Sequence, residues 1–315
     1  MRIVFMGYQT WGHRVLEALL ESRHEIPLVI THPTSSHPYE TIWNHSVAEL
    51  AAACGIPYLV RKRVDDDEAS DRIRHIAPDI LVSSDWRTWV PPCVYRLAKH
   101  GAINIHDALL PKYGGFAPLN WALINGEPEV GVTVHFMNEE FDLGDIVLQS
   151  RISVRPKDTA TDLFQKTIEL FPSMTLEALD LIESGRTDWQ PQDPAKATFF
   201  HKRSAEDSRI DWQWPAACIV NLVRAQPDPY PNAFAYYRGR RVGVLEASVS
   251  LKRYGGTVGR VFCPQGEGIV VVCGPRARTG HDYGVVLERV RDDDGQDFLG
   301  REFFTAMGEY LTSQP

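Results

Sequence analysis

The sequence predicts an α/β protein with a doubly wound, mostly parallel sheet, followed by a smaller β-rich, barrel-like domain. Within residues 1–190, short apolar runs alternate with segments of helical spacing, and this alternation indicates βαβ units. Beyond this region, short strands separated by Gly-rich turns replace the alternation, which favours a barrel. The segment 186–200 contains two prolines and little periodicity. We therefore expect a linker at 191–205 and the second domain at 206–315.

The N-terminal half of the first domain is expected to contain five strands with helices between them. The strands are short apolar runs over 2–7, 26–31, 56–60, 79–84 and 101–106. Helical spacing covers 11–22, 46–55 and 65–77. Ser46 and Gly55 suit the N-cap and the end of the second of these helices. The acidic start of the third favours a helix N-terminus, where the dipole stabilises negative charge.

The rest of the chain mixes the two patterns. In the first domain we expect a helix over 116–126, strands over 130–137 and 145–154, and a long helical segment over 161–185. Pro172 should kink or split that segment, because proline has no N–H and clashes with the preceding turn. The second domain is expected to contain a helix over 214–226, strands within 233–251 and 255–274, a hairpin at 284–295 and a final helix over 301–311.

Composition and charge restrict the possible classes of protein. The net charge of −8 argues against nucleic acid as the main partner, since phosphate-binding proteins usually carry a basic excess. The five cysteines form no C-x-x-C pair, so we expect no disulfide framework, no zinc site and a reducing compartment. No signal peptide or membrane span is predicted, and we expect a cytoplasmic protein. His32, His37 and His45 share a loop, but their spacing matches no metal site.

Polar residues gather at the end of the strand "GAINIH". Asn104 and His106 face the same side because side chains alternate along a strand, and ligands bind beyond the carboxyl ends of such strands. An amide can donate a hydrogen bond to a developing oxyanion, and an imidazole can transfer protons near neutral pH. A carboxylate that orients the imidazole would complete the set. The spacing leaves three candidates for it, namely Asp107, Asp142 and Asp145.

The stretch "NIHDALLPKYGGFAPLNWALINGEPEVGVTVHFMNEEFDLGDIVLQ" (104–149) resembles the signature of formyltransferases that use 10-formyltetrahydrofolate. The resemblance implies that Asn104, His106 and Asp145 are catalytic, with Asp145 orienting His106. It also implies a folate site without a metal, with contacts from Trp86, Arg87, Thr88, Trp89, Leu110 and Asp142. Residues 206–239 resemble the C-terminal domain of the methionyl-tRNA and aminosugar branches. Two positions depart from the family: Ala108 stands for the usual Ser, and Gly114 for the usual Arg.

The amine acceptor is expected to be a small molecule. The loop "THPTSSHPYETIWNH" contains no Lys or Arg, which disfavours tRNA. Details such as "YQTWGH" and "GGFAP" resemble the branch that formylates hydroxyornithine for siderophores, and a nucleotide-linked amino sugar is the alternative. A formyltetrahydrofolate hydrolase and a non-catalytic folate- or nucleotide-binding module remain open. "GYQTWG" lacks the G-x-G-x-x-G of dinucleotide sites, and His135, in an apolar strand, is expected to be a core residue.

Overall fold

The computed structural model describes residues 1–315 and divides them into two compact units. The first unit comprises Met1–Pro118, Glu129–Val154 and Leu163–Lys202; the second comprises Leu119–Pro128, Arg155–Asp162 and Arg203–Pro315. The chain enters the second unit for the last time after Lys202, which lies within the expected linker, 191–205. Two short segments of the first 190 residues belong to the second unit. None of the helices combines the length and apolar character needed to cross a membrane.

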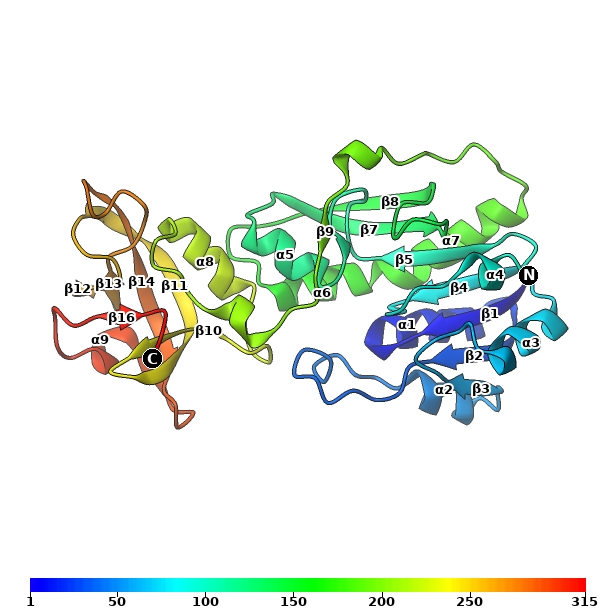
Figure 1. Ribbon diagram of the computed structural model, residues 1–315, viewed down its shortest axis with the longest axis horizontal. Coiled ribbons are helices and arrows are strands. Elements are labelled where there is room, and N and C mark those ends of the chain that lie inside the picture. Colours follow the sequence, from blue (N-terminus) through cyan, green and yellow to red (C-terminus); the bar gives the residue numbers. More distant parts are fainter. The chain divides into compact units, whose positions relative to one another are not determined.

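The first unit is built on a seven-stranded sheet of order β3-β2-β1-β4-β5-β7-β8 (Figure 1). Its strands are β1 (Arg2–Gly7), β2 (Glu25–Thr31), β3 (Tyr58–Val60), β4 (Ile80–Ser84), β5 (Ala102–His106), β7 (Glu129–Phe136) and β8 (Ile146–Ser153). The first five strands pair in parallel, and β7 and β8 are antiparallel additions at one edge. The prediction of a mostly parallel, doubly wound sheet is confirmed.

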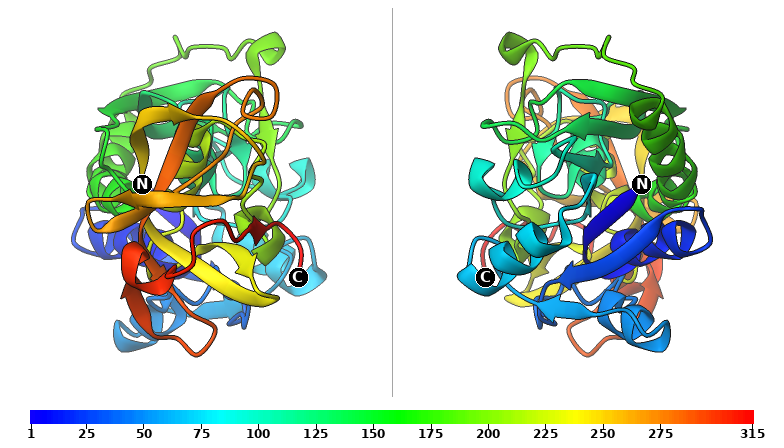
Figure 2. Two further views of the ribbon diagram at one scale, coloured as in Figure 1. Left: turned by 90° about the vertical axis from the view of Figure 1, so that its left-hand side faces the viewer. Right: turned by 90° about the vertical axis from the view of Figure 1, so that its right-hand side faces the viewer.

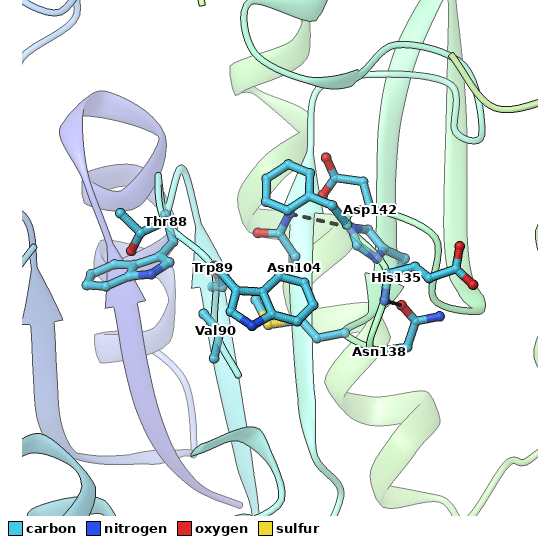
Figure 3. Close-up of a pocket in the computed structure, with 12 residues that line it drawn as sticks. Thr88, Trp89, Val90, Asn104, His135, Asn138 and Asp142 are labelled. Carbon is cyan, nitrogen blue, oxygen red and sulfur yellow. Dashed lines mark hydrogen bonds and ion pairs between the residues drawn. The ribbon is translucent and has the colours of Figure 1, made fainter. Parts of the chain in front are cut away.

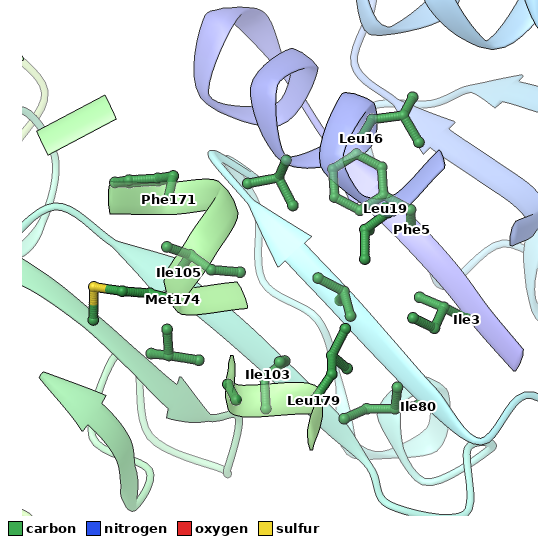
Figure 4. Packing of buried hydrophobic residues seen from close by; sticks show 14 of the residues in the cluster. Ile3, Phe5, Leu16, Leu19, Ile80, Ile103, Ile105, Phe171, Met174 and Leu179 are labelled. Carbon is green, nitrogen blue, oxygen red and sulfur yellow. The ribbon is translucent and has the colours of Figure 1, made fainter. Parts of the chain in front are cut away.

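Helices cover both faces of this sheet. On one face α1 (Gln9–Leu20), α2 (Val47–Ala53) and α7 (Leu170–Glu183) enclose the larger core cluster (Figure 4). On the other face α3 (Asp67–Ile76) and α4 (Pro92–Tyr95) cover a second cluster. Ile3 and Phe5 enter the first cluster and Val4 and Met6 the second. Burial on both faces explains why β1 is a continuous apolar run rather than an alternating one.

The long helical segment is split, as Pro172 predicts. It forms α6 (Ala160–Ile168) and α7, with the break at Glu169. Pro172 is the third residue of α7. Pro172 has no N–H to donate to the carbonyl of Ile168, and its ring crowds that carbonyl, so the segment divides just before it. The proline then lies in the first turn of α7, where it costs little.

The second unit contains an antiparallel sheet of order β12-β13-β14-β11-β10-β16, with β15 paired to β14. Its elements are α8 (Ala216–Arg224), β10 (Ala233–Tyr237), β11 (Arg240–Tyr254), β12 (Val261–Gln265), β13 (Gly268–Val271), β14 (Asp282–Arg291), β15 (Asp297–Leu299), α9 (Gly300–Phe303) and β16 (Leu311–Thr312). The predicted helix over 214–226 and hairpin at 284–295 are confirmed. α5 (Pro118–Ile124) has most of its residues in this unit.

The two edges of this second sheet meet. Val261 N donates to the carbonyl of Glu309 at 2.8 Å, and Leu311 N donates to that of Gly259 at 2.8 Å. The strands accordingly curve around a shared interior, as the left view of Figure 2 shows. The helix predicted over 301–311 is wrong beyond Phe303. The chain instead extends there to pair with residues 259–261, and Gly308 takes a φ of +91°.

Four short elements complete the chain. They are β6 (Gly114–Gly115), η1 (Pro194–Lys196), β9 (Phe199–Phe200) and η2 (Ala205–Ser208). β6 and β9 pair with each other in parallel. This pairing fixes the Gly-rich turn after β5 against a segment more than eighty residues later in the chain.

Candidate functional site

A small pocket of about 40 Å³ lies over β4, β5 and β7, between the loop 86–90 and the loop 137–142. It is lined by Ser83, Trp86, Thr88, Trp89, Val90, Asn104, His135, Met137, Asn138, Glu140, Phe141 and Asp142. Figure 3 shows Thr88, Trp89 and Val90 on one side of this site and Asn104, His135 and Asp142 on the other. We call it the Asn104 pocket.

The floor of the Asn104 pocket is a row of polar side chains on three adjacent strands. Ser83 pairs with Asn104, and Asn104 pairs with His135. The neighbours of Asn104 along the strand, Ile103 and Ile105, enter the core on the opposite face. The strand period of two therefore sends the amide to the pocket and the isoleucines to the core.

His135 holds the amide of Asn104 in place. Nδ1 of His135 lies 2.8 Å from the carbonyl of Phe136, and since a carbonyl only accepts, this nitrogen carries a proton. Burial lowers the pKa of His135, against the opposing charge of Asp142, so the ring is neutral and Nε2 accepts a hydrogen bond. The partner is Nδ2 of Asn104, at 3.4 Å, which leaves the second N–H of that amide free to bind a ligand.

His106, at the carboxyl end of β5, is 8% exposed and does not line the Asn104 pocket. Its Nε2 donates to the carbonyl of Tyr113 at 3.0 Å. Burial opposes the charged form, but the carboxylates of Asp142, Asp107 and Asp85 and the Tyr113 carbonyl together outweigh it, and the pKa of His106 is raised above its ordinary 6.5. An imidazole poised in this way can hold a proton near neutral pH.

Asp142 brings a carboxylate to the site. Its Oδ2 accepts from Gly115 N at 2.9 Å, and its Oδ1 lies 3.6 Å from Nε2 of His135. The backbone at Asp142 has a φ of +56°. Gln192 secures this turn by donating to the carbonyls of Asp142 at 2.9 Å and of Gly144 at 2.7 Å.

The placement of Asp145 differs from the expectation. Its side chain is exposed and does not line the pocket, while its main-chain carbonyl accepts from Phe136 N at 2.9 Å. The close approach of Gly144 to β7 fixes this turn so that Asp142 points inward and Asp145 outward. His135 is buried, as its apolar strand suggested, but it also lines the pocket.

Four of the six residues expected to contact folate line the Asn104 pocket. These are Trp86, Thr88, Trp89 and Asp142. Leu110 is buried and its carbonyl accepts from Gln149 Nε2 at 2.9 Å, so it belongs to the support beneath the site. Arg87 turns away from the pocket toward Glu40, Gln9 and Asp85. Nothing in the sequence distinguished the direction of Arg87 from that of its tryptophan neighbours.

Two buried polar groups of the pocket have no hydrogen-bond partner within the protein. They are the indole N–H of Trp86 and the hydroxyl of Ser83. Both residues line the pocket, but these two polar atoms are buried behind its surface and do not face a ligand as the side chains stand. No group of three or more His, Cys, Asp or Glu side chains in the structure could hold a metal ion.

The two positions that depart from the family, Ala108 and Gly114, lie close to the residues of the site. A Cβ added at Gly114 would approach Phe199 Cδ1 to 2.9 Å and Asp142 Cβ to 3.5 Å. Ala108 is buried, and its carbonyl accepts from Thr133 Oγ1 at 2.6 Å. A side chain larger than glycine at 114 would therefore contact Asp142 directly.

Solved structures resemble this chain over most of its length. The HypX protein of Aquifex aeolicus in complex with tetrahydrofolic acid aligns with a TM-score of 0.57 and 22% identity, over 96% of this chain and 47% of its own. The N-formyltransferase of Helicobacter canadensis in complex with folinic acid and dTDP-3-aminofucose gives 0.62 and 17%, over 94% and 99%. Methionyl-tRNA formyltransferase of Clostridium thermocellum gives 0.55 and 18%, over 79% and 94%.

These likenesses, all below 25% identity, establish the fold, and the chain spans about half the length of HypX. Two family models match the sequence itself. Residues 1–179 match the model of formyl transferase, and residues 202–308 match that of the formyl transferase C-terminal domain. Together they cover nearly the whole chain, which therefore belongs to the formyl transferase family.

Proposed function

We propose that this protein is an N-formyltransferase that moves the formyl group of 10-formyltetrahydrofolate to the amine of a small acceptor. The observation that supports this most is the arrangement of Asn104, His135 and Asp142 in one pocket, with the raised pKa of His106 beside it. Family membership supports the reaction class. The folates bound by the HypX and Helicobacter canadensis proteins support the donor.

Asn104 is proposed to stabilise the reaction's negative charge. When the amine nitrogen attacks the formyl carbon, the carbonyl π bond breaks and its oxygen becomes an oxyanion. The free N–H of the Asn104 amide donates a hydrogen bond to that oxygen. Because His135 already fixes the amide at 3.4 Å, little reorganisation is required when the charge develops.

His106 is proposed to move the proton. The attacking amine loses a proton as the new C–N bond forms, and N10 of tetrahydrofolate gains one as the old C–N bond breaks. His106 can accept the first and supply the second, so its net protonation is unchanged. Asp142 raises the pKa of His106 and takes the supporting role that the family resemblance implies for Asp145.

The folate is proposed to enter the Asn104 pocket from the side of Thr88, Trp89 and Val90. Trp86 and Asp142 line the same pocket and would contact its ring. Arg87 is omitted from this set because it contacts Glu40, Gln9 and Asp85 instead.

For the acceptor, we propose an N-hydroxyornithine-type precursor first and a nucleotide-linked amino sugar second, as in the Helicobacter canadensis enzyme. The test supplies 10-formyltetrahydrofolate with hydroxyornithine, ornithine, dTDP- and UDP-amino sugars, or Met-tRNA, and measures tetrahydrofolate release and formylated product. Formylation of a small amine supports the proposal. Release without any acceptor would mean hydrolysis, release with tRNA alone would exclude a small acceptor, and folate binding without turnover would mean a binding module.

A further inference from the structure

A second and larger pocket, of about 170 Å³, lies beside β1 and β2 in the first unit. It is lined by Tyr8, Gln9, Thr31, His32, Pro33, Thr34, Ser35, Glu40, Thr41, Asn44, His45, Ser46, Val47, Ala48 and Val60. We call it the Glu40 pocket. It adjoins the Asn104 pocket through one aromatic pair, since His32 stacks on Trp86 with ring centroids 3.9 Å apart.

The lining of the Glu40 pocket is polar and contains no Lys or Arg. Hydroxyl and amide groups predominate, and Glu40 is its only carboxylate. His32 is neutral, because burial lowers its pKa to about 4. Phosphate groups in proteins are usually bound by Arg and Lys side chains, and this lining contains neither. The only helix start in it is that of the seven-residue α2. With Glu40 as its one charged side chain, the lining suits a neutral or positively charged polar group.

Glu40 is buried and ionised. Burial favours its neutral form, but hydrogen bonds from Lys202 and Ser35 and the charge of Arg87 hold its pKa at about 2. Arg87 Nη1 donates to Glu40 Oε1 at 2.7 Å. The Nε and Nη2 groups of this guanidinium donate to Asp85 and Gln9, so Arg87 is held rigidly in place.

The second cation on Glu40 is of a different kind. Lys202 Nζ reaches the same Oε1 from a side chain that is 41% exposed. A primary ammonium on a flexible, half-exposed stem is readily displaced. Its position shows that the carboxylate accommodates an ammonium group in addition to Arg87.

We propose that the Glu40 pocket binds the non-reacting end of the acceptor, and that Glu40 holds a second ammonium group there in place of Lys202. The acceptor is then a small diamine or diamino acid, with one nitrogen formylated at the Asn104 pocket. This inference rests on the proposed function for the reacting end. The Glu40 contact itself requires only that a diamino compound binds.

The test measures binding and turnover separately. Calorimetry compares L-ornithine with 5-aminopentanoic acid, which lacks the α-amino group, on wild-type protein and on Glu40→Gln. We expect wild type to bind ornithine about 10- to 100-fold more tightly than the analogue, as for a hydrogen-bonded ion pair. Glu40→Gln should lose that preference. Glu49→Gln, an exposed carboxylate outside the pocket, is the matched control and should keep it.

The Lys202→Met variant distinguishes recognition of a ligand by Glu40 from a merely structural role of the Glu40–Lys202 ion pair. If a ligand ammonium replaces Lys202, removing the competitor should tighten ornithine binding several-fold, whereas loss of a structural ion pair would weaken it. Weaker binding in Lys202→Met, equal binding of the two ligands to wild type, or an unchanged preference in Glu40→Gln would overturn the inference. If formyl transfer to a small amine is observed together with any of these results, the proposed function is still supported. Glu40-dependent binding without any formyl transfer would refute the proposed function alone.

Discussion

Asp142 and Asp145 are three residues apart, but only Asp142 points into the site. The side chain of Asp142 is 9% exposed and 3.6 Å from His135, whereas that of Asp145 is exposed. Asp142 also contributes to the raised pKa of His106. The two residues therefore form a matched pair for testing which carboxylate supports catalysis.

Asp142→Asn should lower kcat by about 10²- to 10⁴-fold, the usual contribution of a positioned acid–base system. Asp145→Asn should keep kcat close to that of wild type, because its side chain contacts nothing in the site. The measurement is tetrahydrofolate release with the acceptor that the screen identifies. Equal losses in both variants would return Asp145 to the catalytic set.

The pH dependence provides an independent test at the same residue. Burial lowers the pKa of His106, but Asp142 and Asp107, together with Asp85 and the Tyr113 carbonyl, raise it by more. Without the negative charge of Asp142, less remains to counteract the effect of burial. The pKa of His106 should therefore fall in Asp142→Asn. The His106 limb of the kcat/KM profile should therefore move to lower pH, measured from about pH 5 to 9. A limb that stays in place would remove His106 from the proton transfer.

At the scale of elements, the turn between β7 and β8 determines which carboxylate points into the site. A Cβ on Gly144 would come within 1.8 Å of the carbonyl oxygen of Phe136. Only glycine permits this approach, which places residues 142 and 145 on opposite sides of the turn. Gln192 then fixes the turn from a distant segment.

Gly144→Ala should consequently lower both stability and activity. The backbone must shift to admit the methyl group, at a cost of about 1–3 kcal/mol in the free energy of unfolding, and the shift displaces Asp142. Urea unfolding and kcat measure the two effects. Gly280→Ala is the control, since an added Cβ there has its nearest contact at 3.6 Å, and it should change stability by less than about 0.5 kcal/mol.

At the scale of the whole molecule, all five cysteines are free and differ in burial. Cys54 and Cys93 are exposed, Cys218 and Cys263 are half-buried and Cys273 is buried. Burial raises the pKa of Cys273 to about 12, and its Sγ donates to the carbonyl of Tyr283. Since the thiolate is the reactive form, native reactivity should follow the packing of both units.

A disulfide-exchange reagent such as Ellman's should react rapidly with two thiols of the native protein and with five after denaturation. Cys54→Ser with Cys93→Ser should remove the rapid phase. Rapid reaction of Cys273, identified by peptide mapping, would contradict the packing of β13 and β14 in the second unit. The measurement needs no substrate and so checks the fold independently of activity.

The sequence by itself determined the sheet, most of its helices and the strand face that Asn104 and His106 share. Apolar runs buried on both faces predict strands directly, and a period of two sends Asn104 and His106 to one face whatever lies beyond. The motif also identified the family. These features are local, or depend only on the alternation of side chains along one element.

The tertiary structure alone decided the remaining features. Strand register puts His135 beside Asn104, although its apolar neighbours indicated a core residue. The contact of Gly144 with Phe136 turns Asp142 inward and Asp145 outward, and Arg87 points to Glu40 rather than to its tryptophan neighbours. Residues 309–312 form a pairing segment instead of continuing the helix, because β12 offers an open edge. Each of these outcomes depends on a partner far away in the sequence, and local patterns carry no information about such a partner.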